Sequence, residues 1–405
     1  MKIRLLIVSI AVSVVGCAGE VEERPLTAVR DSAGIAIVES YGASWGEAEA
    51  WRLAEEPAVR IGQVEGEIEY LLMGAYSALR FSDGTIAVSN TGTEEIRFFD
   101  AEGRYLRSAG GRGGGPGEFE QLVWIYPFGE DSIVAYDDRP PAVKVFHRDG
   151  RFGRSLRPEV LGLLRGAFAD GSLLFEGSGD WSKSRMDGRV RPPTRAFRLD
   201  PRGELLDSLS TFPGREFDRR TRGGSIGLAP PPFGRETVFA VAGDGFFAGS
   251  QDDFELGYYD LHGRLQTIIR WPPHERGVTP EQIEAYRRYE LDGIENENLR
   301  HRVVESLDQQ VYPEMLPAFG PIKFDGTGNL WVQEYHSRWE DTQSWIVFDA
   351  QGRMRGRVVM PGDIIVHQVG DDFVLGYTWD EMDVEYIELY ELIKPLPTEA
   401  TQANG

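Results

Sequence analysis

Residues 77–110 read SALRFSDGTIAVSNTGTEEIRFFDAEGRYLRSAG, and this stretch indicates the fold. It contains two short turns, Asp83-Gly84 and Asp100-Ala101-Glu102-Gly103, and apolar strand-like runs flank both of them. Asp side chains accept backbone hydrogen bonds in turns and Gly allows a positive φ, so both turns favour hairpins between strands. The stretch therefore predicts a meander of four antiparallel strands.

Both turns recur along the chain. The second turn is an apolar residue, Asp, two variable residues, Gly and usually Arg, and it stands at residues 99–104, 199–204, 259–264 and 348–353; the copy at 146–151 has His147 in place of Asp. A turn of the first kind precedes every copy, and a sixth stands at Asp371-Asp372. Since four antiparallel strands make one propeller blade, the repeats predict an all-β, six-bladed β-propeller.

The sixth unit lacks a fourth strand after residues 384–392, whereas two spare strands, 35–39 and 51–61, precede the first unit. We expect one of these N-terminal strands to pair beside the last blade, because closing the ring removes exposed sheet edges. The propeller is therefore expected over residues 31–397, with residues 398–405 as a disordered tail.

A glycine-rich run, Gly110-Gly111-Arg112-Gly113-Gly114-Gly115-Pro116-Gly117-Glu118-Phe119, joins two of these units. Together with the repeated turns of residues 77–151, it resembles NHL-type repeats and six-bladed β-propeller lipoproteins. The resemblance covers nearly the whole chain after residue 30 and implies a fold but no activity, because propellers serve as binding modules, lyases, hydrolases and scaffolds alike. We interpret the run as a linker between blades, because a phosphate-binding loop would need a helix after its glycines.

The N-terminus has the pattern of an export signal. Lys2 and Arg4 precede an apolar run over residues 5–16, which is shorter than the roughly 20 residues that a membrane helix needs. Val14-Val15-Gly16-Cys17 resembles the lipobox of bacterial lipoproteins, and Cys17 is the single cysteine of the chain. We predict a signal peptide at 1–16, a lipid anchor at Cys17 and a tether at 17–30; Ala18 favours the outer membrane, facing the periplasm or the cell surface. An ordinary signal peptide is the alternative.

Composition limits the partners. The 65 Asp and Glu residues outnumber the 43 Lys and Arg residues, so the net charge of -22 argues against nucleic acid. The six histidines show no paired metal-ligand spacing and no serine stands in a nucleophile elbow. We expect a monomer without metal, cofactor or catalytic residues.

The long connections, residues 178–193, 212–233, 272–317 and 335–343, should all leave from one face, because strands of a meander alternate in direction. Loops carry function, so we expect the site on this face. The longest connection predicts a helical hairpin over 279–311, which begins with the capping sequence Thr279-Pro280-Glu281-Gln282. The hairpin could plug the central channel or cover a ligand as a lid, and its apolar stripe favours the plug.

Residues 181–222 contain 11 basic and six acidic side chains, which is unusual in so acidic a chain. Arginine binds carboxylate and phosphate well, so these residues predict a site for an anionic ligand or an envelope protein; an ordinary solvated loop is the alternative. The candidates are Arg215, Arg219, Arg220 and Arg222, with Arg185, Arg189 and Arg191 beside them. Further candidates on the rim are Asp137, Arg139, His336, Arg338, Trp339 and Trp379, and we expect His336 and His367 to approach the central axis.

Two classes of function remain open. The first is a non-catalytic binding or scaffolding module that takes a protein or a small ligand on the loop-rich face. The second is a propeller enzyme, a lyase or hydrolase, with its site in the central pocket. Converging histidines and carboxylates in a deep polar pocket would favour the enzyme.

Overall fold

The computed structural model describes residues 25–177, 187–222 and 225–395. Cys17, the predicted signal peptide and the predicted tail lie outside the described residues. Within them, no helix combines the length and the apolar character needed to cross a bilayer.

Each repeat forms one blade, as the turns predicted. The first three blades are β5 (Ser77–Arg80), β6 (Ile86–Asn90), β7 (Glu95–Phe99) and β8 (Tyr105–Gly110); β9 (Leu122–Phe128), β10 (Ser132–Asp138), β11 (Pro141–His147) and β12 (Phe152–Leu156); β13 (Gly162–Ala167), β14 (Leu173–Gly177), β16 (Pro193–Leu199) and β17 (Leu205–Pro213). The other three are β20 (Val238–Ala242), β21 (Gly245–Gly249), β22 (Glu255–Asp260) and β23 (Leu265–Arg270); β24 (Ile322–Phe324), β25 (Leu330–Gln333), β26 (Thr342–Phe348) and β27 (Met354–Pro361); β28 (Ile365–Val369), β29 (Phe373–Trp379) and β30 (Glu385–Ile393).

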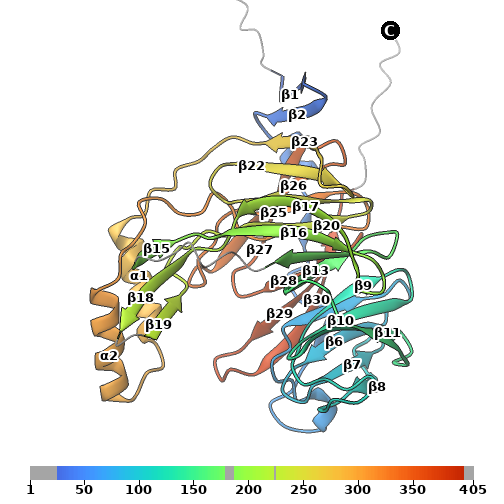
Figure 1. Ribbon diagram of the computed structural model, residues 1–405. Coiled ribbons are helices and arrows are strands. Elements are labelled where there is room, and N and C mark those ends of the chain that lie inside the picture. Colours follow the sequence, from blue (N-terminus) through green and yellow to red (C-terminus); the bar gives the residue numbers. More distant parts are fainter. Residues whose placement is uncertain (1–24, 178–186, 223–224, 396–405) are drawn as a thin grey trace, which may run out of the picture.

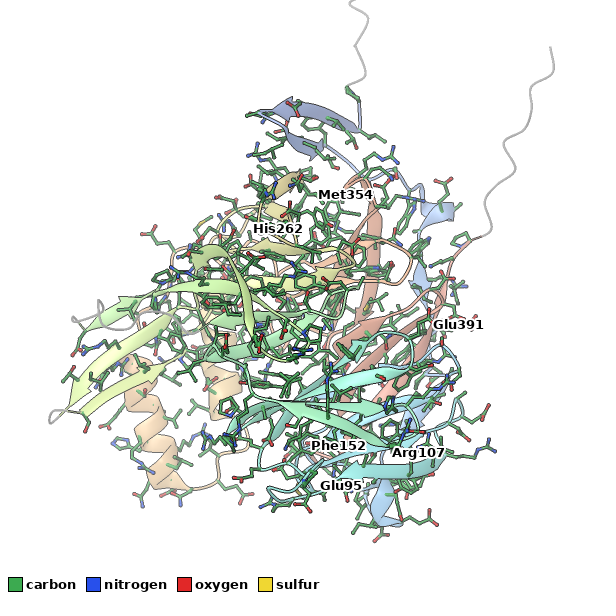
Figure 2. All side chains as sticks on the ribbon, turned by 45° about the vertical axis from the view of Figure 1, so that its right-hand side comes forward. Glu95, Arg107, Phe152, His262, Met354 and Glu391 are labelled. Carbon is green, nitrogen blue, oxygen red and sulfur yellow. The ribbon has the colours of Figure 1, made fainter. Side chains whose placement is uncertain are left out.

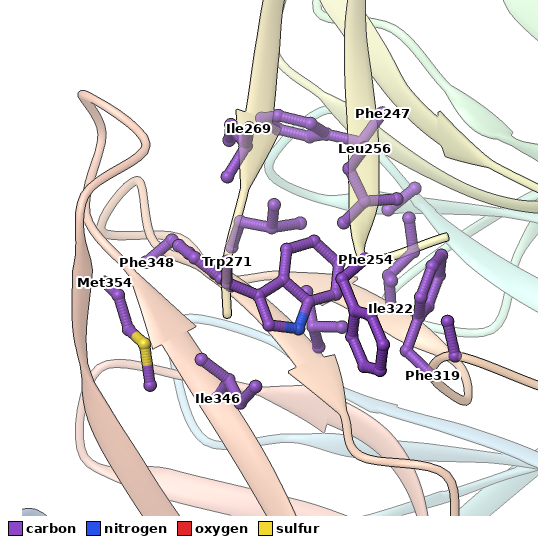
Figure 3. Close-up of a cluster of buried hydrophobic side chains, with 14 of the residues drawn as sticks. Phe247, Phe254, Leu256, Ile269, Trp271, Phe319, Ile322, Ile346, Phe348 and Met354 are labelled. Carbon is purple, nitrogen blue, oxygen red and sulfur yellow. The ribbon is translucent and has the colours of Figure 1, made fainter. Parts of the chain in front are cut away.

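The first strands of the blades surround the central axis. They contact one another in the order β5, β9, β13, β20, β24 and β28, and β28 contacts β5 again, so the six-bladed ring is closed. Apolar clusters fill the spaces between neighbouring blades, as the side chains around Trp271 and Phe348 show for the fourth and fifth blades (Figure 3). Between the first and second blades, Arg107 of β8 (Figure 2) donates to the backbone carbonyl of Arg148, in the turn before β12, at 2.8 Å.

The repeated turns hold the blades in shape through their aspartates. Asp100 Oδ1 accepts the backbone N–H groups of Glu102 at 3.1 Å and Arg104 at 2.8 Å. Gly103 has a φ of +80°, which side chains rarely adopt, and a Cβ there would lie 2.8 Å from Val59 Cγ1. The turn sequence therefore serves both the hairpin and the packing between segments.

The N-terminal strands close the ring. β3 (Arg52–Leu53) and β4 (Val59–Ile61) both pair with β30 in antiparallel register, so they supply the missing outer strand of the sixth blade. This confirms the prediction that an N-terminal strand completes the last blade.

The other spare strand extends the fourth blade. β2 (Ile35–Ser40) pairs in parallel with β23, and β1 (Thr27–Ser32) pairs with β2 on its far side. Ser40 Oγ accepts the backbone N–H of Met354 at 3.0 Å, which ties this hairpin to the fifth blade. The predicted tether of residues 17–30 is therefore too long, because β1 already begins at Thr27. β1 covers an edge of β2 that would otherwise be open.

The elaborate connections gather on one face, at the left of Figure 1. They contain α1 (Pro280–Leu291), α2 (Glu297–Asp308) and a small sheet of β15 (Gly188–Val190), β18 (Phe217–Arg222) and β19 (Ser225–Ala229). The predicted capping box is present, since Thr279 Oγ1 accepts from Gln282 N and Gln282 Oε1 from Thr279 N. Two 3-10 turns, η1 (Glu47–Glu49) and η2 (Ile68–Tyr70), complete the described elements.

The helical hairpin is not the channel plug that we favoured. Among its described residues α1 buries none and α2 buries only Leu307, and Leu299 of the predicted stripe is 42% exposed. A plug would bury its apolar stripe in the channel. This hairpin instead lies on the loops of the face, where aromatic side chains hold it.

Candidate functional site

Of the predicted arginines, those that the structure describes lie on the loop-rich face, and three of them form internal ion pairs. Arg189 lies 3.0 Å from Asp218, Arg191 2.8 Å from Asp252, and Arg219 2.7 Å from Asp187. Arg235, which the sequence analysis did not single out, lies within 2.8 Å of both Glu216 and Asp252. The Arg189 and Arg219 pairs hold the small sheet together, and the contacts of Arg191 and Arg235 with Asp252 connect it to the fourth blade. The positive charge of these four arginines is therefore neutralised within the protein.

The remaining arginines of this group differ in surroundings. Arg215 is half-exposed, 3.9 Å from Glu236, with its guanidinium over the ring of Phe217. Arg220 lines a groove of about 590 Å³ between β18–β19 and α2, together with Arg302 and Glu305. The side chain of Arg222 and all of Arg185 lie outside the described residues. The anionic recognition patch therefore stays a prediction, which now rests on Arg215 and Arg220.

Some of the predicted rim residues likewise form internal contacts, and others are exposed. Asp137 is buried against Lys144 at 2.6 Å. His336 bonds to Glu340 at 3.2 Å through Nδ1 and to the carbonyl of Gly362 at 2.9 Å through Nε2. Arg139 and Arg338 are exposed. Asp137 and His336 thus hold loops in place, while the two arginines are exposed, although Arg139 lies 4.0 Å from Asp138.

Trp339 anchors the helical hairpin. Its ring centroid lies 6.2 Å from that of Tyr286 and 6.0 Å from that of Tyr289, both on α1, and 6.3 Å from that of Phe233. Aromatic pairs at such distances contribute about 0.5–1.5 kcal/mol each beyond their burial. The loop of the fifth blade, the segment before β20 and α1 are therefore joined on this face.

Trp379 is part of a second aromatic group, at the mouth of the sixth blade. Its ring lies 5.6 Å from Tyr377, which in turn lies 6.2 Å from Tyr76 and 6.3 Å from the imidazole of His367. His367 stands on the inner strand β28, as its expected approach to the axis requires, whereas His336 stays in its loop. Tyr377 therefore links Trp379 to His367, a connection that no sequence pattern indicates.

Two further inner-strand residues escaped the sequence analysis. Lys323 on β24 is half-buried, and burial lowers its pKa to about 8. Arg165 on β13 is paired with Glu176, 2.7 Å from Nε to Oε2. A basic residue in the middle of a short apolar strand was the available signal for both. Among the described residues no three His, Cys, Asp or Glu side chains gather as they would around a metal ion.

His367 predicts a pH dependence of stability. Burial, and then the charge of Lys323, lower its pKa to about 3, whereas the imidazole of the unfolded chain binds its proton with the ordinary pKa of 6.5. Between these two pKa values the unfolded state binds more protons than the folded state. The contribution of His367 to the free energy of unfolding is therefore fully present above pH 6.5 and decreases as the pH falls below it. We expect a loss of about 2 kcal/mol between about pH 7 and pH 5 from this group, measured by urea unfolding. In His367→Gln this part of the pH dependence should vanish; an unchanged slope would contradict the assignment.

Comparisons with known proteins agree with the architecture. Residues 69–152 match the model of the DUF5128 family, described as a 6-bladed β-propeller. A Bacteroides fragilis protein described as exported aligns with 88% of this chain and 100% of its own at 12% identity and a TM-score of 0.50. A member of the DUF4221 family from Bacteroides vulgatus aligns with 86% of this chain and 100% of its own, at 11% identity and the same TM-score. No curated protein matches the chain.

These likenesses concern the fold, because sequence identity this low carries no information on ligands or activity. The family match spans the two blades whose turns are clearest in the sequence. Taken with the closed ring of inner strands, it shows that this chain is a six-bladed β-propeller protein.

Proposed function

We propose that this protein is a lipid-anchored binding module of the cell envelope that receives a partner, without catalysis, on its loop-rich face. The observation that carries the proposal is the difference between the two faces. One face ends in tight aspartate turns such as Asp100 to Arg104, and the other carries α1, α2 and the β15–β18–β19 sheet. Elaborated loops on a rigid scaffold are where binding residues concentrate.

The residues of this face suit contact with a protein. Trp339 and the α1 tyrosines form an aromatic group, and Arg215, Arg220, Arg139 and Arg338 surround the face with cations. Aromatic and arginine side chains dominate the centres of protein interfaces. Since the chain as a whole carries a charge of -22, these cations favour an acidic partner surface over a basic one.

Site-specific photo-crosslinking in living cells tests the face. A photoreactive residue at Arg338 or Arg220 should give discrete adducts with a partner. The same residue at Glu102 or Gln351, in exposed turns of the opposite face, is the matched control and should give none. Equal adducts from both faces, or adducts from the turns alone, would exclude the loop-rich face as the binding surface.

The envelope location rests on the N-terminal sequence, and the exported relative from Bacteroides fragilis is in keeping with it. The lipid attaches to Cys17 in this proposal, and Ala18 directs the protein to the outer membrane. Cells grown with a labelled fatty acid should therefore label the wild type and not Cys17→Ser. Label of equal intensity in the variant would show that the anchor is absent or lies elsewhere.

A further inference from the structure

Two basic side chains of the inner strands have no polar partner in the part of the chain that the structure describes. Lys323 makes no hydrogen bond or ion pair to any other described residue, although it is half-buried on an inner strand. Both ring nitrogens of His367 are buried, and neither has a hydrogen-bond partner among residues 25–177, 187–222 and 225–395. Their strands β24 and β28 are neighbours in the ring, and the charge of Lys323 contributes to the lowered pKa of His367, so the two side chains lie in the same region around the axis.

A β-bulge presents His367. Val366 pairs with Gly376 and Gln368 with Leu375, so His367 is the extra residue and stands outside the ladder. The inner strand of the third blade contains a similar β-bulge, in which Arg165 is the extra residue between Leu164 and Gly166. Bulges redirect side chains and recur beside functional sites. Unlike His367, however, Arg165 has a carboxylate partner in Glu176.

An unpaired ammonium and an unpaired imidazole at this depth are unfavourable to folding. A half-buried charge without a counter-ion loses part of its hydration and gains no compensating contact. Proteins keep such groups where function needs them, and perturbed basic residues in clefts are therefore site candidates. An oxyanion between the two would satisfy both, since Lys323 donates up to three hydrogen bonds and neutral His367 donates one.

We propose that the channel wall at Lys323 and His367 binds an oxyanion, the carboxylate or phosphate group of a small ligand. The approach leads from the loop-rich face along Trp379, Tyr76 and Tyr377, whose last ring lies beside His367. Those aromatic faces suit the apolar or carbohydrate body of such a ligand. The site is independent of the protein partner proposed above, so either proposal can fail alone.

Thermal unfolding of the full detergent-solubilised chain tests the site, with acetate and inorganic phosphate as probes and chloride at equal ionic strength as reference. We expect the wild-type Tm to rise with one or both probes. Lys323→Met should remove the rise, or weaken the apparent Kd at least tenfold, while its Tm without a probe is higher than that of the wild type because the unpaired charge is gone. That higher Tm separates lost binding from lost folding.

Two further variants complete the test. His367→Gln should weaken the response several-fold. Lys394→Met, which removes an ammonium paired with Asp371 on the surface, should respond as the wild type does. A response to acetate alone assigns a carboxylate ligand, and one to phosphate alone a phosphate ligand. A wild type that responds to neither probe, or a Lys323→Met variant that responds fully, would overturn the proposal.

Discussion

Deletion of residues 31–62 is expected to abolish the folded, soluble state of this protein. The deletion removes β3 and β4, and with them the outer strand of the sixth blade. It also removes Ile61, a fully buried residue of the apolar cluster between the sixth and first blades. The freed edge of β30 would then be a template for pairing with other chains, so aggregation should accompany unfolding.

Two point variants test the closure without a large deletion. Ile61→Ala should lower the free energy of unfolding by about 2–5 kcal/mol, the range for a large aliphatic side chain in a core. Gly62→Ala should also destabilise, because Gly62 has a φ of +136° and a Cβ there would lie 2.4 Å from the carbonyl oxygen of Glu385. Arg52→Ala, at an exposed position of β3, is the matched control and should be nearly neutral.

Urea unfolding and size-exclusion chromatography measure these outcomes. A deletion variant that remains soluble and monomeric, with an unchanged melting temperature, would show that the strands do not hold the ring together. Point variants within about 0.5 kcal/mol of the wild type, the usual range for surface substitutions, would lead to the same conclusion.

Lys144→Ala should destabilise the second blade by about 3–5 kcal/mol, because it leaves a buried carboxylate unpaired. Lys144 and Asp137 are 6% and 1% exposed and lie 2.6 Å apart. Lys144 also donates to the carbonyl of Glu118, and Asp137 accepts the backbone N–H of Gln121 at 2.8 Å. The pair therefore joins β10, β11 and the loop before β9.

A double variant separates the charge from the packing. Lys144→Met with Asp137→Asn removes both charges but leaves an amide oxygen to accept from Gln121, so we expect it to recover much of the loss. Arg104→Ala, at the exposed pair with Asp100, is the surface control and should cost about 1 kcal/mol or less. If Lys144→Ala cost no more than this control in urea unfolding, the pair would not stabilise the blade.

The Lys144 prediction also bears on partner binding. Asp137 was predicted as a rim residue for recognition, yet its carboxylate is occupied inside the blade. A loss of binding in an Asp137 variant would therefore reflect a displaced loop. Arg139, two residues further on and exposed, is the residue of this loop with which to test recognition directly.

The fold could be predicted from the sequence because its signals are local. An aspartate, a glycine as the fourth residue of the turn and flanking alternation are enough to specify a hairpin. Five copies of that turn, with the six turns that precede the second strands, specify the ring. The capping sequence from Thr279 to Gln282 fixed the start of α1 for the same reason, since both of its hydrogen bonds lie within one helical turn. Closure followed from counting strands, because a blade without its outer strand needs one from elsewhere.

The site depended on contacts that no local pattern carries. The arginines of residues 181–222 looked like a free cationic surface, but Arg191 finds its carboxylate 61 positions further along the chain, in Asp252. The helical stripe suggested a plug, yet the hairpin contacts Trp339, in a loop of the fifth blade 53 residues after Tyr286. Residues so distant in sequence come into contact only when the ring closes. Composition therefore does not predict which charged side chains form internal ion pairs.

The inner strands show most clearly which features the sequence does not predict. Alternation along a strand predicts which side chains share a face, but a bulge shifts that alternation by one residue and sets His367 and Arg165 outside it. The sequence by itself determined the blades, their number and the closing strand, because hairpin turns and strand periodicity are set by neighbouring residues. Only the tertiary structure decided which basic groups stay unpaired, because that depends on the carboxylates which folding brings within hydrogen-bond distance.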